Sequence, residues 1–153
     1  MRKTWEILDL FAIGGCIYGM IEVLWRGYTH WTMTALGGAM FVLFGKMNQL
    51  LPKSMPLLQR GVLGGACVTA AEFAAGCLLN RRLHLKIWDY SHLPFHVLGQ
   101  ICLPFSLCWG ALSMAGMLLN GKICEIAWEE EAFHCPVLKA PVGARAKEKT
   151  ALR

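Results

Sequence analysis

Four long apolar stretches, each followed by a short polar turn, set the pattern of the chain. They cover residues 8–25, 31–51, 57–79 and 95–119. Each approaches or exceeds the roughly 20 residues with which an α-helix crosses a bilayer. Glycine, proline, asparagine and basic residues fill the junctions, where they end helices. The pattern predicts an all-α integral membrane four-helix bundle, with residues 1–120 as its transmembrane domain.

The chain changes character after the fourth stretch. Residues 121–135 mix charged side chains with Ile123 and Ile126, which favours a short interfacial helix on the membrane surface. Residues 136–153 are rich in Ala, Lys and Arg and have little to bury, so a disordered basic tail is expected. Tryptophans lie near the predicted helix ends, as in the aromatic belts of membrane proteins: Trp5, Trp25, Trp31, Trp88 and Trp128.

Composition supports a membrane protein and excludes several other classes. Of the 153 residues, 56% are hydrophobic and 16% are charged, against about half and about a quarter in an average soluble domain. The seven cysteines are an odd number, most lie inside apolar stretches, and none forms a CxxC pair. A disulfide-stapled secreted module and a zinc site are therefore not expected. The net charge of +5 comes from basic residues at the ends of apolar stretches and in the tail, which suits lipid headgroups rather than nucleic acid.

The distribution of Lys and Arg predicts the orientation only weakly. Basic residues near the membrane are slightly more frequent on the side of the N-terminus, and those of the tail add to that side. Cytoplasmic loops carry the excess of Lys and Arg, so both termini are expected in the cytoplasm. Because the excess is small, insertion in both orientations stays open, with an antiparallel dimer that acts as a small exporter.

Two carboxylates lie inside apolar stretches. Glu22 is in the first and Glu72 in the third, each in the later part of its stretch, so both are expected near the same face of the membrane. An acidic side chain at mid-membrane costs about 2.5–3.5 kcal/mol, so it usually faces the bundle interior and marks a functional site. Two interpretations remain open. The pair holds a proton or cation, or each forms a structural salt bridge, Glu22 with Arg26 and Glu72 with Arg81 or Arg82.

Further polar residues are expected at the same face. The fourteen-residue connection over 81–94 is long for a compact bundle, and long connections are often functional. It leads from the third helix into the fourth and carries aromatic, acidic and hydroxyl side chains. The predicted intramembrane polar cluster consists of Glu22, Tyr18, Thr69, Glu72, Asn80, Trp88, Asp89, Tyr90, Ser91, His96 and Gln100.

Small residues and one proline predict how the helices pack. Gly15 and Gly19, and Gly61 and Gly65, form GxxxG pairs that allow close helix contact, either within the chain or between two copies. Pro104 falls inside the fourth stretch, where it is expected to kink the helix.

Several short motifs resemble a known family. They are Trp88-Asp89-Tyr90-Ser91 with Pro94 and Gly99-Gln100-Ile101-Cys102-Leu103, Gly15 and Gly19 with Glu22-Val23, and Glu72-Phe73 with Gly76 and Asn80. Over residues 10–120 the chain resembles the small bacterial membrane proteins known as ABC-transporter permeases, type IV, the CmpB-like family. The resemblance implies a multi-pass protein of the bacterial cell (inner) membrane. His96 stands where the relatives carry Asn, so an amide contact at that position is not expected.

The sequence favours a transport or permease component that moves or binds an ion, a proton or a small polar solute. The alternative is a non-transporting membrane scaffold or regulatory subunit. An enzyme is not expected, because the chain has no Ser/His/Asp spacing, phosphate loop or GxSxG motif. We also expect no metal, cofactor or nucleic acid. The expected partners are the lipid bilayer, a second copy of the chain, and a separate ATPase or other membrane subunit, since an ABC role requires an ATPase that this chain does not contain.

Overall fold

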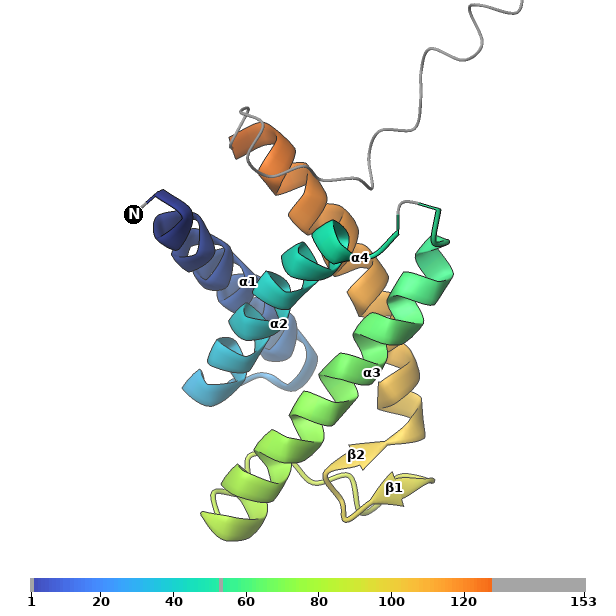
Figure 1. Ribbon diagram of the computed structural model, residues 1–153. Helices are drawn as coiled ribbons and strands as arrows, with labels where there is room; N and C mark the ends of the chain where they lie inside the picture. The colour runs from blue at the N-terminus through green and yellow to red at the C-terminus, as the bar shows by residue number, and fades with distance from the viewer. Residues whose placement is uncertain (1, 53, 128–153) are drawn as a thin grey trace, which may run out of the picture.

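The computed structural model describes residues 2–52 and 54–127 (Figure 1). The predicted tail and the second half of the predicted interfacial helix lie outside these residues. The described elements, in chain order, are α1 (Arg2–Arg26), α2 (Trp31–Leu50), α3 (Leu57–Gly76), the π-helix η1 (Cys77–Arg82), β1 (His96–Val97), β2 (Ile101–Cys102) and α4 (Leu103–Ala127). The predicted all-α, four-helix architecture is confirmed, with one small two-stranded sheet added.

Three of the four helices are long and apolar enough to cross a membrane. These segments are Thr4–Arg26, Leu57–Arg82 and Leu103–Ala127. The last includes residues 121–127, which continue α4 without a break. Within the described part of the chain, α2 is not among the helices whose length and mean hydropathy suit a membrane span, and Lys46, Asn48 and Gln49 lie in its last two turns. The sequence predicted four membrane-spanning helices, and the length and hydropathy of the observed helices support three of them.

The fourth helix begins later than predicted. Residues 95–102 do not extend it; they contain the antiparallel strands β1 and β2, in which His96 pairs with Cys102. Phe95 and Leu98 have φ angles of 56° and 53°, which a right-handed helix does not contain. Pro104 is therefore the second residue of α4, where a missing N–H breaks no helical hydrogen bond, and the predicted mid-helix kink is wrong.

The helices pair as two antiparallel hairpins, α1 with α2 and α3 with α4 (Figure 1). Glycines bring the backbones close. A Cβ atom added to Gly65 would lie 2.7 Å from Cα of Gly110, and one added to Gly15 would lie 2.8 Å from the carbonyl oxygen of Thr34. Gly19 also faces Thr34. The GxxxG glycines thus pack within the chain, which confirms the first of the two predicted uses.

Two buried asparagines join the hairpins. Asn48 Nδ2 donates to the carbonyl oxygen of Met117 at 2.8 Å, and Asn120 Nδ2 donates to that of Phe41 at 3.2 Å. Both side chains are fully buried between α2 and α4. In a bilayer such hydrogen bonds between helices contribute about 0.6–2 kcal/mol, where the hydrophobic effect contributes little. The main apolar core lies beside them and consists of Leu10, Phe41, Phe44, Val68, Met117 and Cys124.

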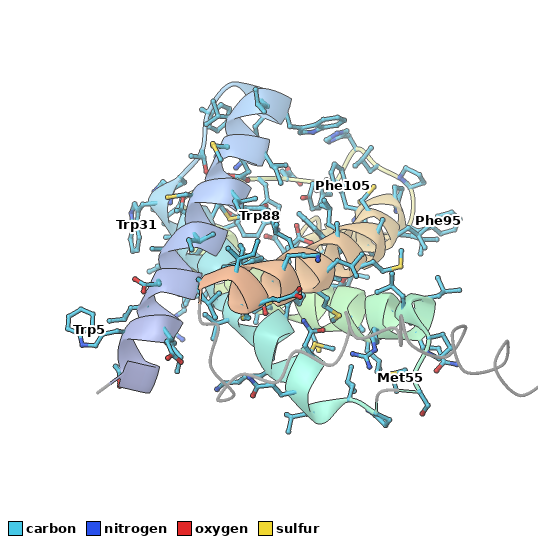
Figure 2. All side chains as sticks on the ribbon, turned by 90° about the horizontal axis from the view of Figure 1, so that it is seen from above. Trp5, Trp31, Met55, Trp88, Phe95 and Phe105 are labelled. Carbon is cyan, nitrogen blue, oxygen red and sulfur yellow. The ribbon has the colours of Figure 1, made fainter. Side chains whose placement is uncertain are left out.

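Large apolar side chains cover the outside of the bundle, as expected for a surface that meets lipid. Trp5 and Trp31 project away from the helices, and Trp31 is 74% exposed (Figure 2). Trp88 differs from Trp5, Trp25 and Trp31, because it is only 6% exposed and packs against Met33 and Ile87. Trp128 lies outside the described residues. Its prediction as an interfacial residue is wrong. The connection after η1 folds back onto the bundle and buries this ring.

Candidate functional site

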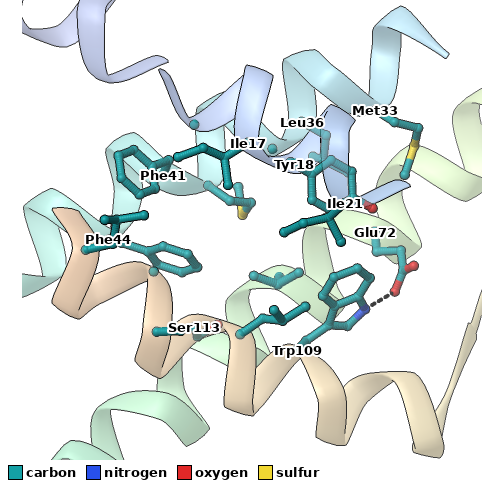
Figure 3. Close-up of a pocket in the computed structure, with 18 residues that line it drawn as sticks. Ile17, Tyr18, Ile21, Met33, Leu36, Phe41, Phe44, Glu72, Trp109 and Ser113 are labelled. Atoms are coloured by element: carbon teal, nitrogen blue, oxygen red, sulfur yellow. Dashed lines mark hydrogen bonds between the residues drawn. The ribbon is translucent and has the colours of Figure 1, made fainter. Parts of the chain in front are cut away.

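Glu72 lies in α3 and is 2% exposed. Its Oε1 accepts a hydrogen bond from the Tyr90 hydroxyl at 2.9 Å. Its Oε2 accepts one from the Trp109 indole Nε1 at 2.7 Å, which Figure 3 shows. Both donors are uncharged, and the predicted salt bridge to Arg81 or Arg82 is not formed, since both arginines are exposed. Glu72 is thus a buried carboxylate whose partners satisfy its oxygens without a positive charge.

Glu22 has a different environment. Its Oε1 lies 2.7 Å from Nη2 of Arg26, the helical i,i+4 pair predicted from the sequence. The Thr29 hydroxyl donates to Oε2. Arg26 also donates from Nη1 to the carbonyl oxygen of Ile87 at 3.2 Å, which connects the end of α1 to the connection after η1. Glu22 is therefore paired with a cation, and the predicted structural salt bridge is confirmed here.

Two aromatic rings connect the two carboxylates. The Tyr18 hydroxyl donates to Glu22 Oε1 at 3.5 Å, and the Trp109 indole donates to Glu72. The centroids of the Tyr18 and Trp109 rings are 6.0 Å apart, with planes tilted by 43°. Glu22, Tyr18 and Glu72 from the predicted cluster therefore meet at one place, between α1, α3 and α4.

A second group of predicted residues forms a hydrogen-bond network at the end of α3. Asn80 Nδ2 donates to the carbonyl oxygen of Trp88 at 3.1 Å and to Gln100 Oε1 at 2.9 Å, and its Oδ1 accepts the Ile87 N–H at 2.7 Å. The Trp88 indole donates to the carbonyl oxygen of Gln100 at 3.0 Å. The Gln100 side chain can pack against α3 because residue 76 is a glycine. A Cβ atom at Gly76 would lie 2.5 Å from Gln100 Oε1. These residues hold the connection against the helix.

This network places Tyr90 over Glu72. The Tyr90 N–H donates to the carbonyl oxygen of Gly99 at 2.8 Å, and the Tyr90 ring stacks on Phe105 with centroids 4.8 Å apart. Burial, followed by the charge of Glu72, raises the pKa of the Tyr90 phenol well above its ordinary value. The phenol therefore stays protonated at physiological pH and acts as a donor.

The remaining predicted residues lie apart from both groups. Asp89 and Ser91 form an exposed turn, in which Asp89 Oδ1 accepts the Ser91 N–H at 2.9 Å and its hydroxyl at 2.5 Å. His96 is exposed, and its Nδ1 accepts the Gly99 N–H at 3.3 Å. Thr69 lines a different hollow, a groove of about 630 Å³ between α3 and α4. None of these four side chains forms a hydrogen bond with Glu72, whose partners are Tyr90 and Trp109.

A cavity of about 280 Å³ lies beside Glu72, between the two helical hairpins (Figure 3). Its walls come mainly from α1, α2 and α4 and are almost entirely apolar. Glu72 lies at one end, Phe41 and Phe44 lie at the other, and Tyr18 and Trp109 lie close to the carboxylate. The arrangement therefore combines one buried carboxylate with an apolar space large enough for a small molecule.

The sequence prediction missed three residues of this site: Trp109, Arg26 as a contact of the connection, and Thr29. A signal for Trp109 was present, because a tryptophan in mid-span, away from the interfaces, needs an acceptor for its indole N–H. The partner of Thr29 depends on how the α1–α2 turn closes, which no local pattern shows. Among the described residues, no group of three or more His, Cys, Asp or Glu side chains is arranged to hold a metal ion.

Comparison with known proteins supports the family resemblance. The sequence matches the family described as "Putative ABC-transporter type IV" (ABC_trans_CmpB) over residues 9–132. Searches of the curated proteins and of the solved structures found no match. The matched region contains Glu22, Glu72 and the connection with Tyr90, so it includes the whole candidate site. The chain, an integral membrane protein, belongs to the ABC_trans_CmpB family.

Proposed function

We propose that the protein is the membrane component of a transport system and that it binds a cation or a proton at Glu72. Membership of a transporter-type family and three membrane-span-capable helices support a transport role. One observation carries the specific proposal: the Glu72 carboxylate borders a partly open apolar cavity between the helices and has only uncharged hydrogen-bond partners.

The contrast with Glu22 supports the choice of Glu72. Arg26 neutralises Glu22 within one helical turn, so a second cation gains little from binding there. Glu72 has no such partner within the described residues, and each oxygen accepts one hydrogen bond and keeps further lone-pair capacity. A carboxylate in a poorly polar site binds a proton or a cation because either one removes the cost of its buried charge.

The location and partner belong to the same proposal. The protein resides in the bacterial inner membrane with both termini in the cytoplasm, and a separate ATPase subunit supplies the energy of an ABC-type cycle. The chain binds and conducts; it does not catalyse. In the competing interpretation, a scaffold, Glu72 serves only to hold Tyr90 and Trp109 in place.

Glu72→Gln tests the proposal. The full chain is reconstituted in liposomes, a proton gradient is imposed, and internal pH is followed with a trapped dye. We expect proton flux to fall by about tenfold or more in the variant, as expected for loss of a charged hydrogen-bonding group worth about 1.5–3 kcal/mol. Glu125→Gln, at an exposed position of α4, is the matched control and should keep wild-type flux.

Two results would argue against transport through Glu72. One is unchanged proton flux in Glu72→Gln, with the variant folded as judged by its thermal unfolding. The other is loss of folding in both Glu72→Gln and Trp109→Phe, since the second variant removes only one donor to the carboxylate. That pattern would favour the scaffold.

A further inference from the structure

We infer that the ligand of the Glu72 cavity is a small organic cation with a single positive charge and an apolar body. This inference rests on the proposed function, in that it identifies the class of cation that Glu72 binds. Three features of the site carry it: the size of the cavity, the chemistry of its walls and the position of its one carboxylate.

The size of the cavity points beyond a proton or a bare ion. Its volume is about 280 Å³, just below the range of about 300–1,000 Å³ typical of pockets for drug-sized ligands. A water molecule occupies about 30 Å³ of liquid, so the space is many times larger than a proton site requires. It suits a molecule of about one aromatic ring with substituents.

The walls disfavour an inorganic cation. Ca²⁺ takes about six to eight oxygen ligands, and Mg²⁺ takes about six, several of them water. Apart from Glu72, the side-chain oxygens of the lining belong to Tyr18 and Ser113. The Tyr18 hydroxyl already donates to Glu22, and the rest of the lining is aliphatic or aromatic, as at Ile17, Ile21 and Leu36. A hydrated ion would lose its water here without replacement, whereas an apolar body gains from the same walls.

The negative charge of the site favours a positively charged ligand. Among the described residues that line the cavity, Glu72 is the one carboxylate, and none is a lysine or an arginine. The Tyr18 and Trp109 rings lie next to this carboxylate (Figure 3). Aromatic faces attract ammonium groups, with quaternary ammonium ions as a well-established example. The cationic centre therefore lies near Glu72, Tyr18 and Trp109, and the apolar body extends toward Phe41 and Phe44.

Benzyltrimethylammonium is a suitable probe, because neopentylbenzene has the same shape and no charge. Binding of each compound to the full chain in detergent micelles is measured by calorimetry, with empty micelles as the reference. We expect benzyltrimethylammonium to bind the wild type at least tenfold more tightly than Glu72→Gln. Neopentylbenzene should bind both proteins equally and more weakly than the cation binds the wild type.

Ala115→Phe tests the cavity without touching the carboxylate. Ala115 lines the cavity, and Ala111, one turn earlier in α4, lines the separate groove between α3 and α4. We expect Ala115→Phe to weaken benzyltrimethylammonium binding at least tenfold and Ala111→Phe to leave it within twofold. Together the two variants keep the test informative even if Glu72→Gln does not fold.

The outcomes separate this inference from the proposed function. Equal binding of the cation and its neutral isostere, or binding unaffected by Ala115→Phe, would overturn the organic-cation inference. If Glu72→Gln still loses proton flux in that case, the proposed function stands alone. Unchanged flux in Glu72→Gln together with Glu72-dependent binding of benzyltrimethylammonium would instead overturn proton transport through Glu72 and leave the ligand class intact.

Discussion

Two glutamates of the same bundle differ in what surrounds their charge. Glu22 faces Arg26 at 2.7 Å, whereas Glu72 accepts hydrogen bonds from a phenol and an indole. An ion pair within the protein removes the need for any external charge, and a carboxylate held by neutral donors does not. At the scale of single residues, this difference gives Glu22 a structural role, and it is the reason why the proposed ligand site is at Glu72.

The exposed turn at Asp89 gives a prediction about pH. The Ser91 hydroxyl, and then its N–H, hold the pKa of Asp89 below its ordinary value. A depressed pKa means that the contribution of the carboxylate to the folded turn is complete above its ordinary pKa of about 3.9 and is lost as the pH falls through the lower folded value. The Asp89 carboxylate should therefore stay ionised between about pH 5 and 8 and keep accepting both hydrogen bonds from Ser91.

Ser91→Ala removes the larger of the two effects. We expect the pKa of Asp89 to rise toward its ordinary value, measured by carboxyl ¹³C chemical shifts during a titration in micelles. The control is Ser106→Ala, which removes a hydroxyl that donates to the carbonyl oxygen of Cys102. This variant should leave the pKa of Asp89 unchanged. An unchanged pKa in Ser91→Ala would contradict the role of the hydroxyl.

How far single residues could be predicted depended on the distance to their partners along the chain. The Glu22–Arg26 pair follows from helical spacing alone. The partners of Glu72 lie 18 and 37 residues away, at Tyr90 and Trp109, and only the path of the connection brings them together. The sequence motif that contains Asp89 and Ser91 indicated the family, but not that both residues lie outside the cavity.

At the scale of elements, the α3–α4 hairpin depends on close backbone contact. Gly65 and Gly110 face each other, but they are not equivalent. A Cβ on Gly65 would lie 2.7 Å from the backbone of Gly110, whereas one on Gly110 would come no closer than 3.8 Å to the Gly61 carbonyl oxygen. Backbone atoms cannot turn aside as a flexible side chain can, so the two positions should differ in their tolerance of alanine.

This asymmetry predicts different stabilities for two matched variants. Gly65→Ala should lower the free energy of unfolding by about 1–3 kcal/mol, the usual cost of overpacking. Gly110→Ala should change it by no more than about 0.5 kcal/mol. Unfolding in mixed micelles with increasing dodecyl sulfate gives both values. Equal destabilisation by the two variants would show that the close contact is not as the structure places it.

The elements also show where an apolar pattern misleads. Residues 95–102 are apolar enough to read as the start of a helix, but Phe95, Leu98 and Gly99 all have positive φ and form a hairpin instead. Hydropathy measures how well a segment suits lipid, but it does not predict whether the backbone adopts positive φ angles. The long helices themselves were predicted correctly because their length and composition leave few other structures in a membrane.

At the scale of the whole molecule, the cavity lies between two hairpins, and Asn48 and Asn120 join them. The arrangement places the α1–α2 turn and the connection after η1 at one end, and the α2–α3 turn at the other (Figure 1). In a membrane, this placement requires α2 to cross with its neighbours, although α2 is not among the helices whose length and mean hydropathy suit a span. Its pairing with α1 and α4 buries Asn48, whereas Lys46 and Gln49 in the same turns stay exposed.

Single cysteines at Tyr28, Ser54 and Ser91 test this placement, in a background without the seven native cysteines. We expect a membrane-impermeant maleimide to label positions 28 and 91 from outside intact cells and position 54 only after the cells are opened. If α2 does not cross, positions 28 and 91 will be labelled from opposite sides. Labelling of every position from both sides would indicate insertion in two orientations.

The π-helix at the end of α3 has a consequence for the gene. Its wider turn, closed by the Leu83 N–H on the Leu78 carbonyl oxygen at 3.0 Å, holds one residue more than an α-helical turn. Loss of a single codon between Glu72 and Asn80 would turn Asn80 about 100° around the helix. Its three hydrogen bonds would break, and Tyr90 would leave Glu72. In this segment the protein should tolerate the substitution of a residue more easily than the deletion of one.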